Sequence, residues 1–71
     1  MTRAQAKKYA KDTMNKYPMG DVDHEQAKTE LYAAHKIMVE VGQRDGWGYG
    51  VGELCDDLDN LGTYHWQRSI A

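Results

Sequence analysis

The sequence has little of the chemistry that cross-links a protein or embeds it in a membrane. It holds one cysteine, Cys55, and one proline in 71 residues. A single thiol excludes an internal disulfide and favours a reducing compartment. No stretch approaches the ~20 apolar residues that span a bilayer, and no apolar run follows the charged N-terminal segment. We therefore expect no signal peptide, no membrane partner and a soluble, cytoplasmic protein.

Net charge is also small, at −2, and by itself it favours no class of partner. The distribution of the charges is more informative. Residues 1–17 carry five lysine or arginine side chains against one aspartate, a net of +4. Residues 47–71 carry four acidic side chains against one arginine, a net of −3. Two ends of opposite sign predict either attraction within a helical bundle or a molecule with two different faces.

No stretch alternates apolar and polar residues as a half-buried strand does, and the apolar residues instead repeat at helical spacing. A first helix is predicted over residues 2–17. Pro18 cannot continue it and disfavours helical geometry at Tyr17. The apolar stripe of this helix consists of Ala6, Tyr9, Ala10, Thr13, Met14 and Tyr17.

A second helix is predicted from Asp23, whose pairing with Gln26 resembles a capping box, to near Gly42, which would supply a left-handed cap. Its main stripe is formed by Ala27, Leu31, Ala34, Met38 and Val41. Tyr32 and Val39 form a second apolar edge. A helix with two apolar edges lies centrally in a bundle or packs against a second chain. We therefore expect a weak homodimer formed through that second edge.

A third helix is predicted from near Val51, with its acidic residues opposite an apolar face. That face consists of Val51, Leu54, Cys55, Leu58 and Leu61. Two endings stay open: a break at Gly62 followed by a short final helix, or a continuous helix to about Ser69. Residues 1–71 are therefore predicted to form a single all-α domain, a small three- to four-helix bundle.

Five of the seven glycines fall within residues 42–52, between the second and third helices, and alternate there with Trp47 and Tyr49. Such a density of glycine is typical of a backbone that turns or approaches something closely. Large aromatics on such a loop favour a recognition site, because they bring contact area with few torsions to freeze. The alternative is that both rings fold inward as a lid over a small core, with Trp47 covering Tyr32.

Catalytic and metal-binding patterns are lacking. The three histidines and Cys55 do not form the closely spaced ligand pairs of a structural zinc site. The acidic residues of the third helix lack the second carboxylate pair that a magnesium site needs. Cys55 with His65 is the one nucleophile and base pair, and no glycine-flanked turn presents the thiol. The glycines match neither a P-loop nor a dinucleotide-binding motif. We expect no enzyme activity, no metal and no cofactor.

The leading functional hypothesis is a protein-binding module. Interfaces concentrate their binding energy in Trp, Tyr and Arg, which predicts hot spots at Arg44, Trp47 and Tyr49. Asp56 and Asp57 would lie at the rim and steer a basic partner. A very small, cysteine-poor chain without a catalytic set is typical of phage-encoded accessory proteins that act as inhibitors or adaptors. We therefore expect docking on a larger protein.

The alternative is a nucleic-acid-binding helical module. The basic side chains of the first helix would neutralise phosphates, while Trp47 or Tyr49 stacks on a base. These basic side chains are Arg3, Lys7, Lys8 and Lys11. In the sequence, however, the two aromatics adjoin the acidic segment rather than the lysines. That placement favours a protein partner.

Overall fold

A computed structural model describes residues 1–70 and places three α-helices in them: α1 (Arg3–Lys16), α2 (His24–Asp45) and α3 (Val51–Ser69). No strand occurs in these residues, so the predicted all-α fold is confirmed. The bundle has three helices, and the option of a fourth is excluded because α3 is continuous.

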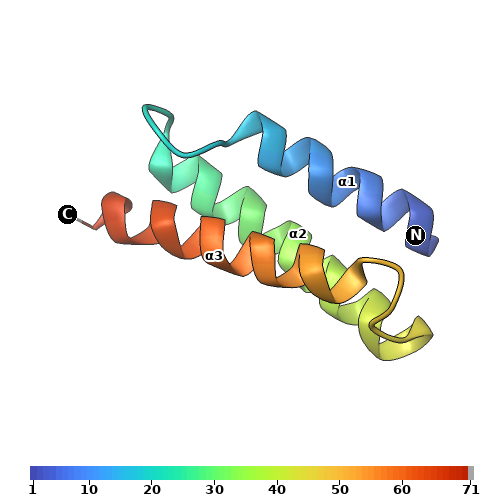
Figure 1. The fold of residues 1–71 in the computed structure, drawn as a ribbon. Helices are drawn as coiled ribbons and strands as arrows, with labels where there is room; N and C mark the ends of the chain where they lie inside the picture. Colours follow the sequence, from blue (N-terminus) through green and yellow to red (C-terminus); the bar gives the residue numbers. More distant parts are fainter. Residues whose placement is uncertain (71) are drawn as a thin grey trace.

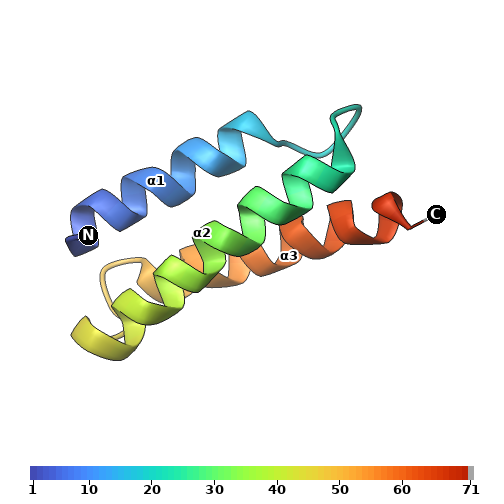
Figure 2. The same cartoon turned by 180° about the vertical axis from the view of Figure 1, so that it is seen from behind.

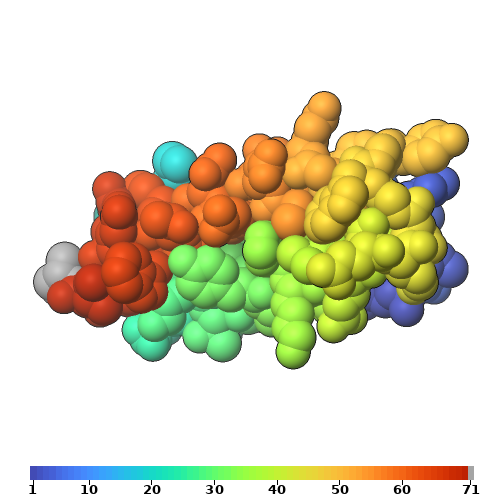
Figure 3. Space-filling model, turned by 90° about the horizontal axis from the view of Figure 1, so that it is seen from below, coloured from blue at the N-terminus to red at the C-terminus, as the bar shows by residue number. Residues whose placement is uncertain are grey.

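Successive helices run in opposite directions, and α2 and α3 lie side by side along most of their length (Figures 1 and 2). Figure 3 shows this pair closely packed along one face of the molecule. The bundle is elongated, with extents of 37 × 17 × 15 Å. The N-terminus lies at the same end as the α2–α3 loop, residues 46–50, which we call the aromatic loop. The α1–α2 loop and the C-terminal end of α3 lie at the opposite end.

Helix α1 matches its predicted bounds to within one residue at each end. Thr2 is its N-cap: the Thr2 hydroxyl accepts a hydrogen bond from the backbone N–H of Gln5 at 3.1 Å. The Gln5 side chain accepts one from the backbone N–H of Thr2 at 2.9 Å, completing a capping box that the sequence analysis did not identify. Tyr17 is the C-cap directly before Pro18, as the proline predicts.

Helix α2 begins as predicted, with the Asp23 carboxylate accepting from the backbone N–H of Gln26 at 3.1 Å. Its predicted end near Gly42 is wrong. The helix continues to Asp45, and Gly46, at φ 95°, is the C-cap, with its N–H donating to the Gly42 carbonyl at 2.8 Å. Gly42 serves packing instead, because the Trp47 ring fills the space that a Cβ at position 42 would occupy.

Helix α3 passes through Gly62 without a break and ends at Ser69, so the second of the two predicted endings is correct. The ring of Tyr32 lies against Gly62, where an added Cβ would come within 2.7 Å of Tyr32 Cε1. The second apolar edge of α2 is therefore partly covered by α3 rather than left free. A homodimer through this edge stays a prediction.

The core lies along the line where the three helices meet. Leu31, Met38, Leu58 and Val51 are its largest fully buried apolar side chains. Four fully buried alanines, Ala6, Ala10, Ala27 and Ala34, also belong to it. Small side chains at these positions let helix backbones approach closely. Between residues 1 and 70, none of the helices is long and apolar enough to cross a membrane.

Candidate functional site

The aromatic loop makes a tight connection between α2 and α3. Gly46 and Gly50 both adopt positive φ, at 95° and 81°, which glycine does at little cost. Two hydrogen bonds close the turn: Val51 N–H donates to the Gly48 carbonyl and Gly52 N–H to the Trp47 carbonyl, both at 3.1 Å. Tyr49 also has a positive φ, 56°, an uncommon conformation for a bulky residue. The neighbours of Tyr49 must therefore hold a conformation that costs of order 1–3 kcal/mol.

Trp47 is neither buried as a lid nor free. One part of its ring packs on Gly42 of α2, while 48 % of the residue surface stays exposed. The alternative in which Trp47 covers Tyr32 is wrong, because Tyr32 packs on Gly62 and Trp47 on Gly42, ten residues along α2 from Tyr32. Trp47 is thus an exposed aromatic side chain with an anchored ring.

Tyr49 is 76 % exposed and lies beside the basic residues of α1. The Arg3 guanidinium stacks over its ring, 4.1 Å from the centroid, and the Lys7 ammonium donates a hydrogen bond to its backbone carbonyl. The expectation that the loop aromatics adjoin the acidic segment rather than the lysines is therefore wrong for Tyr49. The reason is topological: the antiparallel arrangement brings the start of α1 back to the α2–α3 loop.

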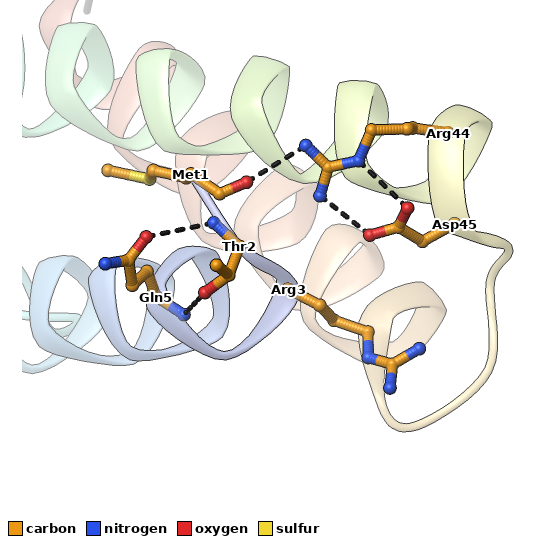
Figure 4. Close-up of a pocket in the computed structure, with 6 residues that line it drawn as sticks. All are labelled: Met1, Thr2, Arg3, Gln5, Arg44 and Asp45. Atoms are coloured by element: carbon orange, nitrogen blue, oxygen red, sulfur yellow. Dashed lines mark hydrogen bonds and ion pairs between the residues drawn. The ribbon is translucent and has the colours of Figure 1, made fainter.

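Arg44 is exposed, but its guanidinium is engaged within the chain (Figure 4). Its Nε and Nη2 donate to the two carboxylate oxygens of Asp45 at 2.9 and 2.7 Å, and Nη1 donates to the Met1 carbonyl at 2.9 Å. The Arg44 hydrogen bond holds the pKa of the Asp45 carboxyl below its usual range. Arg3, from the same end of α1, points away from this cluster and toward the aromatic loop. Arg44 thus links the end of α2 to the start of the chain.

The other two lysines of the predicted basic face differ from Lys7. Lys8 donates to the Asp12 carboxylate at 2.7 Å, and this hydrogen bond raises the pKa of the Lys8 ammonium. Lys11 is exposed and makes no hydrogen bond or ion pair with residues 1–70. The basic face therefore keeps one unpaired ammonium, next to two cations engaged with Tyr49.

Asp56 and Asp57 lie exposed on α3. Successive helical residues point roughly 100° apart, so the two carboxylates flank the exposed side of the helix rather than forming a pair. Within residues 1–70, neither makes a hydrogen bond or ion pair with the aromatic loop. Glu53, in the first turn of α3, is the acidic residue nearest to the loop along the chain.

A histidine pair at the opposite end of the molecule, one buried and one half-buried, was missed by the sequence analysis. Nδ1 of His24, in the first turn of α2, lies 2.8 Å from Nδ1 of His65 on α3. His65 is fully buried, and its Nε2 lies 3.1 Å from the Tyr17 carbonyl. The Tyr64 ring packs edge-on against His65, with the ring centroids 4.9 Å apart. One imidazole therefore contacts the end of α1, the start of α2 and the body of α3.

The environment of His65 disfavours its charged form. Burial lowers the pKa of the His65 imidazole most, the charge of His24 lowers it further, and hydrogen bonding to the backbone at Tyr17 and Pro18 opposes the shift. The positive charge of Arg68, whose guanidinium stacks on Tyr64 at 3.5 Å, also lowers it. His65 is therefore held neutral at physiological pH.

Cys55 is buried against the core, and burial raises the pKa of its thiol, which the carboxylates of Asp56 and Asp59 raise further. His65 lies ten residues away, or about 15 Å along a helix, so it does not serve as a base for this thiol. Within residues 1–70, no three His, Cys, Asp or Glu side chains converge as metal ligands do.

The features suited to recognition thus gather at one end: two exposed aromatics, the cations Arg3 and Lys7, and the start of the acidic helix α3. The loop conformation is held from both sides, by α2 under Trp47 and by α1 beside Tyr49. In comparisons with models of protein families, with curated proteins and with solved structures, no match to this chain was found.

Proposed function

We propose that this chain is a small binding module, an inhibitor or adaptor of the phage accessory type, that docks on a larger protein through the aromatic loop. The observation that carries the proposal is the state of Trp47, whose ring is anchored on Gly42 while about half of the residue stays exposed. An aromatic side chain that is already ordered loses little entropy on binding, so more of its contact energy appears as affinity.

Tyr49 also supports docking of a protein at the aromatic loop. Its ring is the more exposed of the two, and Arg3 and Lys7 hold both the ring and the strained backbone in place. Tyr and Trp are enriched among the residues that dominate binding energy at protein interfaces. The loop therefore offers two preformed anchors, separated in the chain by Gly48 alone.

The charges around the loop favour a protein over a polyanion. Arg3 and Lys7 flank the loop on one side, while Glu53 lies in the first turn of α3 after it, with Asp56 and Asp57 further along that helix. A surface that presents both signs complements the mixed charges of a protein surface, whereas its carboxylates repel a phosphate backbone. Arg44 contributes less than its residue type suggests, because Asp45 and Met1 engage its guanidinium.

The test is quantitative capture of partners from the source cell by the immobilised chain. We expect the Trp47→Ala/Tyr49→Ala double variant to retain at least tenfold less of any specific partner, since losing one hot spot alone costs about 2 kcal/mol or more. Trp66→Ala is the matched control: Trp66 is 43 % exposed but lies in the last turns of α3, at the opposite end of the molecule. Capture by this control should equal that of the wild type.

Equal recovery of every partner by the double variant and the wild type contradicts the proposal. Circular dichroism of each variant shows whether the helices are intact, so a loss of capture can be separated from a loss of fold.

A second candidate, a nucleic-acid-binding module, is favoured by one observation: Arg3 and Lys7 lie against Tyr49, so cations and an exposed ring that could stack on a base are adjacent. If this candidate is correct, Lys7→Glu and Lys11→Glu weaken binding to single-stranded oligonucleotides, and affinity falls steeply with salt. Lys16→Glu is the control, because Lys16 lies at the far end of α1 beside Glu30. The absence of any gel shift at low salt eliminates this candidate.

A further inference from the structure

The His24–His65 contact joins parts of the chain that are far apart in sequence. His65 Nε2 meets the Tyr17 carbonyl at the end of α1, and its Nδ1 meets His24 at the start of α2. Tyr64, beside it on α3, accepts a hydrogen bond from the backbone N–H of Gly20 in the α1–α2 loop at 3.0 Å. The end of the bundle opposite the aromatic loop is therefore closed by imidazole and phenol hydrogen bonds around one buried ring.

The hydrogen-bond partners determine where the protons lie. A carbonyl oxygen only accepts, so His65 Nε2 carries the proton that is donated to Tyr17. Neutral His65 then has a bare Nδ1, which accepts from the Nδ1–H of His24. One proton thus lies between the two facing nitrogens. His24 can also carry a proton on its other nitrogen without disturbing this contact.

We propose that the His24–His65 pair is an acid-sensitive contact between α2 and α3. When a proton from solvent binds to Nδ1 of His65, the contact breaks and this end of the bundle opens. When His24 keeps its own Nδ1–H, as it must once its Nε2 also carries a proton, two Nδ1–H donors face each other at 2.8 Å with no acceptor between them. The cation would also lie in a fully buried position, where burying a charge without a compensating partner is costly. The pair therefore separates, and the Tyr17 contact is strained with it.

The charged groups around His65 do not stabilise its protonated form. From α2 the neighbouring charge is that of His24, and from α3 it is that of Arg68, and both disfavour a second cation. Tyr64, which packs between them, contributes a neutral ring.

The α1–α2 loop carries two carboxylates, Asp21 and Asp23, and neither is among the groups that shift the pKa of His65. At the end of α1, the Lys16 ammonium lies over the Tyr17 ring, 5.3 Å from its centroid. The carboxylate of Asp23, the residue before His24, accepts from the backbone N–H of Gln26 and caps α2. This proposal does not depend on the proposed binding function, because the histidine pair and the aromatic loop lie at opposite ends of the bundle (Figure 1).

The sign of the pH effect follows from the lowered pKa of folded His65. The unfolded chain takes up a proton near the ordinary value of 6.5, before the folded chain does. Stability from this contact is thus fully present above pH 6.5 and is lost as the pH falls through and below that value. For a single proton, the opening equilibrium shifts by at most about tenfold per pH unit.

The experiment is amide hydrogen exchange of the full chain between pH 7.5 and 5.0, corrected for intrinsic exchange rates. Protection of residues 62–69 and 19–26 should fall by up to about tenfold per unit below pH 6.5, while that of residues 38–54 changes less. Histidine ¹⁵N shifts at pH 7.5 should show the proton on Nε2 of His65 and on Nδ1 of His24.

Two variants complete the test. In His65→Asn, the side-chain oxygen can accept from His24 but does not titrate, so the pH dependence of protection should flatten. His35→Asn is the control, since His35 is half-buried on α2 outside the pair and its loss should leave the pH dependence intact. Uniform loss of protection over all three helices, an unchanged profile in wild type, or equal effects of both variants overturns the proposal. If His65→Asn does not fold, the wild-type exchange pattern and the ¹⁵N shifts still show whether acid opens this end of the bundle first.

Discussion

Replacing Leu31 by alanine is expected to lower the free energy of unfolding by about 2–5 kcal/mol. Leu31 is fully buried in α2, the helix that packs against both others, so the lost side chain leaves a cavity that the neighbours fill only in part. A domain of this length has a total stability of roughly 4–11 kcal/mol. Urea unfolding followed by circular dichroism should therefore show a midpoint shifted strongly downward, or a chain already partly unfolded without denaturant.

The matched control for Leu31→Ala is Ile70→Ala. Ile70 follows α3 and is mostly exposed, so its truncation should change stability by less than about 0.5 kcal/mol. If both variants lose the same stability, Leu31 is not at the centre of the core.

Replacing Gly62 by leucine is expected to cost about 3 kcal/mol, near the upper part of the usual range for overpacking. Even a Cβ at this position would lie 2.7 Å from Cε1 and 3.0 Å from Cδ1 of Tyr32, so a full leucine must displace the ring or separate α2 from α3. Helix propensity alone predicts the opposite sign, because leucine is a better helix former than glycine by somewhat less than 1 kcal/mol. Chemical denaturation distinguishes the two outcomes by the sign of the change.

The double variant Tyr32→Ala/Gly62→Leu tests the cause. With the ring removed, leucine gains the vacated space, so its cost should largely disappear relative to Tyr32→Ala alone. Gly48→Leu is the control for a glycine in open space, since an added Cβ there meets nothing within 4 Å. Additive effects of the Tyr32 and Gly62 changes would show that the two residues do not press on each other.

Local signals predicted α1 and the start of α2 well. Pro18 cannot continue α1, so the helix ends directly before it, and Asp23 caps α2 through its own side chain. Both boundaries therefore depend on neighbouring residues only. Glycine carries no comparable local signal. At Gly42 and Gly62 the helix continues because a ring from elsewhere fills the space of the missing side chain, and such tertiary packing outweighs intrinsic propensity.

The candidate site was predictable only where it depends on residues that are neighbours in the sequence. Composition identified Trp47 and Tyr49 as aromatics on a glycine-rich loop, and left open whether they were exposed or folded inward; the structure has them 48 % and 76 % exposed. Composition did not identify Arg3 and Lys7 as neighbours of Tyr49, because these residues lie more than forty positions away from it and meet the loop through the antiparallel topology. The contact between His24 and His65 spans 41 positions. Their places in the first turn of α2 and on the apolar face of α3 indicate proximity only once the helix order in space is known.

The raised pKa and burial of Cys55 make it an internal reporter of opening. The thiolate is the form that reacts with disulfide reagents, and both its formation and its access are suppressed in the folded chain. Modification of this single thiol must therefore wait for α3 to separate from the core. Labelling kinetics at Cys55 thus measure the lifetime of the closed bundle without any added probe.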